Sequence, residues 1–409
     1  MNVLFLTQIL PFPPDAGPKV KTYHVIRALL SQGHSVTLVS FVRPEEEPHI
    51  PALQEICESV HAVPIRRSRV ADAMYMVRSY LTGRPFLIER DDLRLMQDTV
   101  NHLVREKDYQ FIHADQLTMV QFALRASSVF PGKKPKVIFD AHNAVWTIVE
   151  RMKENARWFL KPILAIEAKR VKKYEGELLQ KVDYVLAVTE IDRTLLEDAL
   201  PFSSTVRKND FVSPITVIPI AVDTERLQPV NRKPGSKNIV TLGTLHYPPN
   251  ADGIRWFFTE VFPLVQKRVP DATLTIIGKN PPQDFLDLAE RNPGKIRVTG
   301  YVSDLVPYLE ESALMVVPVR AGGGMRVRIL EAFAYGMPVV TTTVGLEGIQ
   351  ATSDSHVLVA DTPADFANST SELLENASLQ AKLALNGREL ASRKYDWQAV
   401  LSAMKQIYE

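Results

Sequence analysis

Residues 318–348, PVRAGGGMRVRILEAFAYGMPVVTTTVGLEG, decide how the rest of this chain is interpreted. The apolar run 313–318 predicts a buried strand, and it ends in a loop with three consecutive glycines at 322–324. Apolar residues then recur at helical spacing from about Met325, until a glycine and a proline end the helix. Residues 339–343 are β-branched enough to form the next strand. The stretch therefore predicts a glycine loop that leads a strand into a helix N-terminus.

The start of this predicted helix has the features of an anion site. Its free N–H groups and its dipole favour a negative charge. Arg326 and Arg328 fall in the first turn, where a cation opposes the dipole, so we expect them to serve a bound anion. Glu331 follows three residues after Arg328 on the same face. Phosphates at the loop and a hydroxyl-binding carboxylate one turn deeper suggest a nucleotide diphosphate. An ordinary parallel sheet with solvated charges fits the same spacing.

The segment LEAFAYGMPVV, residues 330–340, resembles the signature of retaining glycosyltransferases of family 4. The resemblance implies an α/β protein of the GT-B fold, with two Rossmann-like doubly wound domains facing across a cleft. That family usually carries Glu-x7-Glu, and Glu331 matches its second glutamate. The first would fall at Gly323, so this chain resembles a glycine-rich subset of the family. Glu331 and Gly323 are therefore predicted to take part in catalysis, with Gly322, Gly324, Met325, Arg326 and Arg328 binding the donor.

Size and composition agree with a two-domain soluble protein. The chain has 409 residues, of which 45% are hydrophobic and 23% charged, so two sizeable cores can form. A net charge of +1 gives no argument for a nucleic-acid partner. The lone Cys57 excludes an intrachain disulfide and fits a reducing cytoplasm. The N-terminus has no basic leader and no apolar run suits a bilayer span, so we expect a cytoplasmic protein, with peripheral contact at the inner membrane face.

The N-terminal region opens as a βαβ unit. Residues 2–6 and 35–42 predict strands, with a helix over 19–31 between them. The intervening loop has five prolines and only Gly17, so it is not a dinucleotide fingerprint. PPDAGPKVKTYHVIRAL resembles the family segment whose glycine lets the backbone approach the donor, although a second glycine is common where this chain has Pro18. Gly17 is either such a donor-binding residue or a plain turn glycine.

Polar residues follow two later strands. Strands are predicted at 111–113, 137–140 and 184–189, whereas 45–110 looks helical and without chemistry. The second of them ends in Asp140-Ala-His142-Asn143, at the edge where open α/β sheets bind ligands. A histidine there is often only structural. The family has a histidine at a matching place that contacts the donor sugar, which implies a catalytic role for His142. Asp115 and Gln116 are further candidates.

Residues 151–173 are rich in lysine and arginine, with Trp158 and Phe159 among the charges. A basic, aromatic-bearing helix can lie on an anionic bilayer. Apolar residues at helical spacing would equally give a core stripe with a solvated basic face. A sugar transferase with a lipid-linked acceptor would use the first arrangement.

A second α/β series begins after a breaker-rich segment, and its first helix is predicted over 253–268. The predicted division is an acceptor-side domain 1–224, a hinge 225–237, a nucleotide-sugar domain 238–390 and a C-terminal helix 391–409 that returns to the first domain. Polar loops follow its strands at Gly243 and Lys279. Many family members have a basic residue where this chain has Leu245, so Lys279, Arg326 and Arg328 are expected to supply that charge. Gly300-Tyr301-Val302 resembles the stretch that lines the base pocket, which adds Tyr301 and Val302 to the donor site.

The motifs that are missing complete the prediction. The sequence has no Asp-x-Asp, no His-Glu-x-x-His and no Gly-x-x-x-x-Gly-Lys-Ser/Thr. Backbone N–H groups and arginines must then neutralise a leaving diphosphate, without a metal or another cofactor. We therefore predict a retaining hexosyltransferase of polysaccharide biosynthesis, using a nucleotide-sugar donor and a glycan, lipid-linked or small-molecule acceptor. A nucleotide-sugar epimerase or hydrolase of the same fold, and a non-catalytic nucleotide-sugar-binding protein, are the alternatives.

Overall fold

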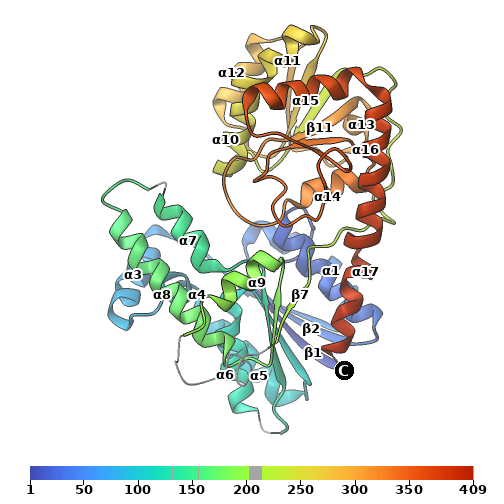
Figure 1. Ribbon diagram of the computed structural model, residues 1–409. Coiled ribbons are helices and arrows are strands. Elements are labelled where there is room, and N and C mark those ends of the chain that lie inside the picture. Colours follow the sequence, from blue (N-terminus) through green and yellow to red (C-terminus); the bar gives the residue numbers. More distant parts are fainter. Residues whose placement is uncertain (131, 155, 202–213, 409) are drawn as a thin grey trace. The chain divides into compact units, whose positions relative to one another are not determined.

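The computed structural model describes residues 1–130, 132–154, 156–201 and 214–408. These form two compact units, one of Met1–Ile220 with Leu401–Glu409 and one of Ala221–Val400. Each unit is an α/β structure built on one parallel sheet, which confirms the predicted fold class (Figure 1).

The first unit contains a seven-stranded sheet in the order β3-β2-β1-β4-β5-β6-β7. Its strands are β1 Asn2–Thr7, β2 Ser35–Val42, β3 Ser59–Pro64, β4 Phe111–Asp115, β5 Lys136–Ala141, β6 Tyr184–Ala187 and β7 Ile215–Val217. Its helices are α1 Gly17–Ser31, α2 Ile50–Gln54, α3 Arg69–Thr82, α4 Phe86–Asp91, α5 Arg94–Glu106, α6 Leu117–Val129, α7 Val145–Glu154, α8 Lys161–Leu179 and α9 Glu190–Glu197, with a 3-10 helix at Pro44–His49. The central strands are almost wholly buried because helices cover both faces of a parallel sheet.

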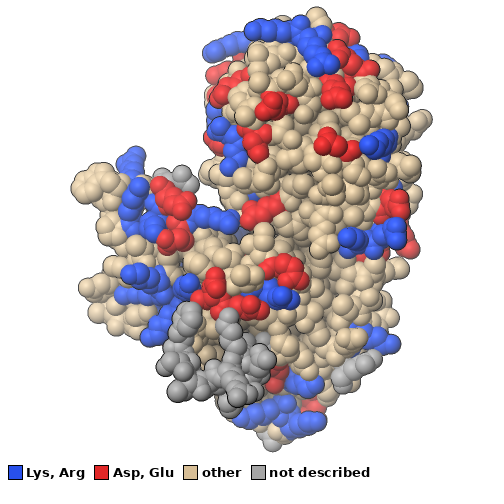
Figure 2. Space-filling view, viewed as in Figure 1, with Lys and Arg blue, Asp and Glu red and all other residues tan. Residues whose placement is uncertain are grey.

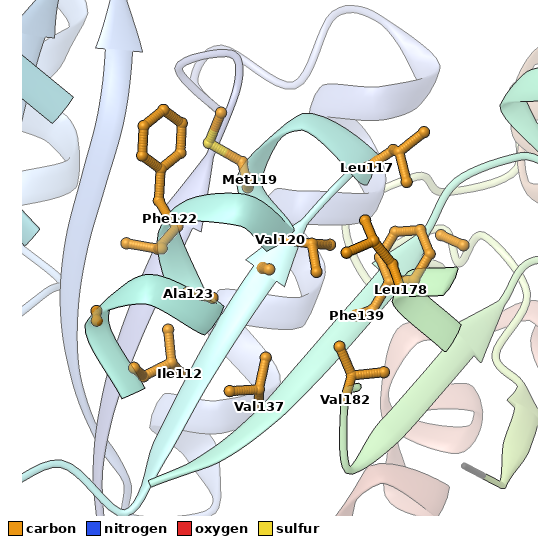
Figure 3. Packing of buried hydrophobic residues seen from close by; sticks show 14 of the residues in the cluster. Ile112, Leu117, Met119, Val120, Phe122, Ala123, Val137, Phe139, Leu178 and Val182 are labelled. Atoms are coloured by element: carbon orange, nitrogen blue, oxygen red, sulfur yellow. The ribbon is translucent and has the colours of Figure 1, made fainter. Parts of the chain in front are cut away.

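Helix α6 shows how this core is packed. Figure 3 shows its side chains Met119, Val120 and Phe122 in one apolar cluster with Ile112 of β4 and Val137 of β5. All five are at most 2% exposed. Truncating a buried phenylalanine such as Phe122 to alanine typically costs about 3–5 kcal/mol, so packing of this kind holds α6 against the sheet.

The second unit contains a six-stranded sheet in the order β10-β9-β8-β11-β12-β13. Its strands are β8 Asn238–Leu242, β9 Thr273–Ile277, β10 Ile296–Gly300, β11 Ser312–Val317, β12 Val339–Thr341 and β13 Leu358–Val359. Its helices are α10 Pro248–Trp256, α11 Phe262–Arg268, α12 Gln283–Arg291, α13 Val306–Glu310, α14 Val327–Ala334, α15 Pro363–Glu375 and α16 Ala377–Leu390, with π turns at Phe257–Val261 and Ala391–Tyr395. The short helix α17, Trp397–Leu401, and the 3-10 turn Ser402–Gln406 follow.

Three predicted elements differ from the structure. Residues 45–110 are not helical throughout, because β3 pairs with β2 at the sheet edge; its half-exposed sequence SVHAVP gave no strand signal. The first helix begins at Gly17 rather than 19, since Pro18 is tolerated in a first turn. The helix predicted over 253–268 is interrupted by a π turn before Pro263, which has no N–H for the helical ladder.

The observed division lies at 220/221 and 400/401, whereas the predicted boundaries are 224/225 and 390/391. Backbone pairing explains the difference. The Val222 N–H donates to the Tyr395 carbonyl at 2.8 Å, and the Trp397 N–H donates to the Val222 carbonyl at 3.0 Å. The predicted hinge is likewise tied to the second unit, because the Lys233 N–H donates to the Glu310 carbonyl at 2.7 Å.

In the described part of the chain, no helix combines the length and the apolar character needed to cross a bilayer.

Candidate functional site

The carboxyl ends of β8, β9 and β11 meet at the switch point of the second sheet. From β8 the chain goes first to one side, through β9 and β10, and later to the other side, through β11. In open parallel sheets ligands bind beyond the carboxyl ends of strands at such a point. All the predicted site residues of this unit follow one of these strands or β10.

The glycine loop after β11 has a backbone that only glycine adopts readily. Gly322 and Gly324 have φ angles of 101° and 86°, in the left-handed region, while Gly323 does not have a positive φ. Helix α14 begins at Val327, two residues later than predicted, and Met325 is buried against the protein. The loop therefore extends further before the first helical N–H groups.

Arg326 holds this loop together. Its Nη1 donates to the carbonyl oxygen of Gly323 at 2.6 Å and also to that of Gly324. The guanidinium thus turns back onto the loop and donates to its carbonyl oxygens. These carbonyls are then occupied, and the loop's N–H groups are left for other partners. This differs from an arginine that simply projects from a first turn.

Arg328 lies deeper and links α14 to β8. Its Nη1 donates to the Leu242 carbonyl at 2.7 Å, and its Nη2 donates to Oδ1 of Asn250 at 2.5 Å. Burial and the neighbouring Arg326 lower the pKa of Arg328 to about 10, against the opposing effect of Glu331. The guanidinium is therefore still charged at neutral pH, and it adds positive potential beside the loop.

Two glycines at strand ends make this close approach feasible. A Cβ at Gly243 would lie 2.6 Å from Nη1 of Arg328. A Cβ at Gly278 would lie 1.9 Å from the carbonyl oxygen of Gly243. A larger residue at Gly278 would push the ends of β8 and β9 apart, and one at Gly243 would displace the Arg328 guanidinium.

Glu331 lies one turn into α14 and is half-buried. Burial raises the pKa of its carboxyl, and Arg328 opposes that rise. The pKa of Tyr335 is raised by its own burial and then by Glu331, so the two side chains are near neighbours. Within the described residues the Glu331 carboxylate accepts no hydrogen bond, so its oxygens are available to a ligand.

Lys279 and Tyr301 form a separate pair after β9 and β10. The Lys279 ammonium lies 4.5 Å from the centre of the Tyr301 ring, a cation–π contact. The Tyr301 side chain is 58% exposed, and Val302 beside it is half-buried. An exposed aromatic ring at the carboxyl edge offers a flat surface for stacking.

In the first unit, His142 is held by a carboxylate. Its Nε2 lies 2.7 Å from Oδ1 of Asp115, and the imidazole is 8% exposed. Asp115 is the last residue of β4 and also accepts hydrogen bonds from Thr7 at 2.8 Å and Thr22 at 3.0 Å. Because Nε2 donates to Asp115, the imidazole orientation is fixed and Nδ1 remains for another partner.

A buried ionic network continues from this pair. Lys21, on α1, forms a buried ion pair with Asp140. Burial alone would raise the pKa of Asp140, but Lys21 and the neighbouring histidines outweigh it and hold that pKa far below its usual range. His113 lies between Asp140, at 3.4 Å, and the hydroxyl of Tyr408, at 2.5 Å. Gly17, the predicted donor-binding glycine, is the first residue of α1. It therefore lies one helical turn before Lys21 of the network.

The side chains of His113, Asp115 and Asp140 could in principle hold a metal ion, since their ligand atoms lie within 4.8 Å of one another. Oδ1 of Asp140 is already paired with Lys21, and Asp115 accepts from two threonines and His142, whereas Oδ2 of Asp140 and Nε2 of His113 make no hydrogen bond among the described residues. A cation bound there would lie beside the buried Lys21 ammonium, which opposes its binding. These side chains therefore fit an ionic network in which Lys21 balances the charge of Asp140.

Comparison with known proteins fits this geometry. One family model, described as "Glycosyl transferases group 1", matches residues 236–376. A second, described as "Glycosyltransferase Family 4", matches residues 17–226 and so covers just over half of the chain. The chain belongs to glycosyltransferase family 4. The predicted family is thereby confirmed.

Characterised relatives of this family 4 protein align with about half of their own length. Glycogen synthase of Mycobacterium tuberculosis is 27% identical over 208 residues, which cover 47% of this chain and 48% of that protein. Phosphatidyl-myo-inositol mannosyltransferase of the same organism is 25% identical over 204 residues, covering 47% of this chain and 53% of that protein. Among solved structures, Anabaena HepE in complex with UDP has a TM-score of 0.68 at 13% identity and covers 100% of this chain and 99% of its own. The fold is the predicted GT-B fold.

Within this family 4 protein, the structure brings together Gly243, Arg326, Arg328 and the glycine loop, with Glu331 beside Arg328. Lys279 and Tyr301 meet each other, and His142 and Gly17 belong to the first unit. Sequence reasoning missed Asn250, Lys21 and Tyr408. A signal existed for Lys21, which lies on the apolar side of α1 next to Val20 and close to Val25.

Proposed function

We propose that this protein is a retaining, metal-independent glycosyltransferase that moves a hexosyl group from a nucleotide-diphosphate sugar to an acceptor hydroxyl. The observation that carries the proposal is the Glu331 carboxylate. It lies one turn into α14 beside Arg328 and accepts no hydrogen bond from the described residues. Leaving a largely desolvated carboxylate without donors costs free energy, which ribose hydroxyls would recover.

The diphosphate is held by the glycine loop and Arg328. Arg326 occupies loop carbonyls, so the N–H groups of the loop and of the first turn of α14 face the phosphates. The Arg328 charge lies beside them and stabilises the negative charge that grows on the leaving group. In this arrangement Arg326 acts through the loop it shapes.

The base stacks against Tyr301, whose exposed ring is covered on one side by Lys279. Structures of the fold neighbour HepE contain UDP and UDP-glucose, which supports a uridine donor as the first to test. His142 contacts the sugar, with its orientation fixed by Asp115. Gly323, where relatives have a glutamate, lets the backbone approach the sugar-phosphate.

Retention follows from attack on the departing face. The acceptor oxygen forms a bond to the anomeric carbon as the bond from that carbon to the diphosphate oxygen breaks. The leaving phosphate oxygen takes the acceptor's proton, so the products are the glycoside and the nucleotide diphosphate. No protein side chain needs to change its protonation state.

The acceptor is a glycan or a lipid-linked sugar, as in polysaccharide biosynthesis. The names of the two relatives, a glycogen synthase and a phosphatidyl-myo-inositol mannosyltransferase, support both kinds. A cytoplasmic location fits Cys57, whose thiol is buried and whose pKa burial raises to about 12, so it stays reduced and unreactive.

The experiment measures binding and turnover separately. In a thermal-shift screen of nucleoside diphosphates, one ligand at about 100 times its Kd should add about 2.7 kcal/mol of stability. Transfer from the matching α-linked sugar nucleotide, followed by NMR of the anomeric proton, should give an α-linked product in excess EDTA. Activity that is lost in EDTA and restored by manganese would contradict metal independence. An epimerised or free sugar favours the isomerase or hydrolase alternative, and binding without turnover favours a sensor.

A further inference from the structure

Exposed apolar side chains of this protein are concentrated in one small part of the first unit. Thirteen of the twenty large apolar side chains that are exposed among the described residues lie within 70–81 of α3, 148–152 of α7, 158–160 just before α8, and 163–166 of α8. Leu81 is 78% exposed, Trp158 83% and Ile163 57%. Isolated exposed apolar residues are ordinary, but a concentration of this kind marks an interaction surface.

The two segments form one surface, which we call the α3–α8 face and define as the exposed residues of 69–82 and 148–173. The Arg170 guanidinium on α8 lies 6.0 Å from the ring centre of Tyr80 on α3. The N–H of Phe86, just after α3, donates to Glu167 on α8 at 2.6 Å. Figure 1 shows α3, α7 and α8 grouped together beside the first sheet.

This face is also basic. Residues 151–173 contain eight lysines and arginines, among which Lys161, Lys169 and Lys173 are exposed. Several of the nearby acids are occupied: Glu167 by the Phe86 N–H, Glu150 by Lys153, and Glu175 by the N–H groups of Val145 and Trp146. Figure 2 shows Lys and Arg side chains distributed around uncharged surface on the projection that carries these helices.

The combination of basic and apolar side chains on the α3–α8 face indicates which kind of partner binds there. A second copy docked on the same face would bring like charges together, which opposes a symmetric dimer. A bilayer with anionic headgroups satisfies both components, since apolar side chains enter the headgroup boundary while lysines and arginines pair with phosphates. Trp158 and Phe159 are aromatic residues of the type that favours this boundary.

We propose that the α3–α8 face binds the surface of an anionic lipid bilayer. The inference is independent of the proposed transferase activity, because it uses no residue of the donor site. It adds α3, a helix in which no functional residue was predicted, to the basic segment 151–173, which suggested a membrane contact.

The first test uses Trp158 as a reporter in the full chain. Trp256 and Trp397 are 4% and 7% exposed and Trp146 is half-buried, whereas Trp158 is 83% exposed, so Trp158 is the tryptophan best placed to report lipid contact. Vesicles of phosphatidylcholine with one-third phosphatidylglycerol should shift the emission to the blue, and pure phosphatidylcholine should not. Trp158→Phe should lose the shift and still sediment with the anionic vesicles. Equal sedimentation with both vesicle types, or with neither, overturns the proposal.

Variants then locate the surface. Leu81→Glu and Ile163→Glu should each abolish most sedimentation with the anionic vesicles, whereas Leu385→Glu, at an equally exposed site on α16, should not. Lys161→Gln and Lys169→Gln should each weaken partitioning about fivefold, and binding should fall as salt is added. UDP affinity should stay at the wild-type value in all of them. A concentration-dependent dimer that Leu81→Glu disrupts, without any lipid binding, would show that the face contacts another copy instead.

Discussion

The glycine loop of the second unit and the ionic network of the first unit occupy equivalent places yet are built in opposite ways. Both lie at carboxyl ends of parallel strands, where the strand order reverses. In the network, Asp115 accepts hydrogen bonds from Thr7, Thr22 and His142. Asp140 forms an ion pair with Lys21 of the same unit. Beside the loop, the Glu331 carboxylate accepts no hydrogen bond from described residues. Both carboxylates of the network thus have partners within the protein, although Oδ2 of Asp140 makes no hydrogen bond, whereas the Glu331 carboxylate has no such partner among the described residues.

The largest effect should come from breaking the network. Lys21→Met leaves Asp140 charged, buried and without its ammonium partner, which should lower the free energy of unfolding by about 3–5 kcal/mol. Urea denaturation measures it. Lys173→Met is the matched control, since the ion pair of Lys173 with Glu177 is exposed and should cost at most about 1 kcal/mol. Similar losses in both variants would mean that burial adds nothing to the Lys21 pair.

The next effect concerns a buried carboxyl near the network. Glu175 caps the N–H groups of Val145 and Trp146, and burial raises its pKa to about 8. The folded chain therefore keeps a proton that the unfolded chain releases near pH 4.5, so this stabilisation is full at low pH and is lost as pH rises toward 8.

Wild-type stability should accordingly contain a decline between pH 5 and pH 8 on the order of a few kcal/mol, which Glu175→Gln should remove. Glutamine keeps one acceptor oxygen, for one of the two N–H groups, and does not titrate. Equilibrium unfolding in urea at both pH values measures this. The same pH dependence in the variant and in wild type would assign the decline to other groups.

Glu331→Gln tests the ligand side of the comparison. Loss of charge-assisted hydrogen bonds, each about 1.5–3 kcal/mol, should weaken nucleoside-diphosphate binding tenfold or more in calorimetry. Stability should change little, because this carboxylate accepts no hydrogen bond from the described residues. Glu290→Gln, on exposed α12, is the control. Unchanged affinity in Glu331→Gln would remove Glu331 from the site.

His142→Ala should separate the two regions functionally. We expect turnover to fall about tenfold to a hundredfold, from the loss of one oriented hydrogen bond to the sugar, while UDP affinity stays unchanged. Turnover is measured as KM and kcat for the sugar nucleotide, and UDP affinity is measured by calorimetry. Equal losses for UDP and the sugar nucleotide would indicate a structural role for His142.

The smallest effects should come from single methyl groups in the glycine loop. Gly324→Ala adds a Cβ at φ 86° and should cost about 1–2 kcal/mol of stability. Gly323→Ala, where φ is not positive, should leave the melting temperature nearly unchanged and lower the specificity constant for the donor. Gly323→Glu should fail to raise activity. A wild-type specificity constant in Gly323→Ala, or a gain in Gly323→Glu, would show that this glycine is incidental.

Much of the second unit could be predicted because its signals are local. The strand, glycine loop and helix around Glu331 follow each other along the chain, and their periodicity shows in the sequence. The role of Arg326 could not be predicted, because a first-turn arginine can point at a ligand or turn back onto its own loop. The structure shows the second arrangement. Asn250 was missed because its contact with Arg328 joins residues 78 positions apart.

The sequence by itself determined the family, the two parallel-sheet units and the residues that lead into the glycine loop, since each depends on spacing within one or two elements. Only the tertiary structure decided which polar groups meet. Lys21 and Asp140 are 119 residues apart, and His113 and Tyr408 are 295 apart. The strand order of the first sheet, and the return of the C-terminal segment to this unit, bring them together. Local patterns carry no record of strand order, because it is set by how helices and strands bury apolar area against one another.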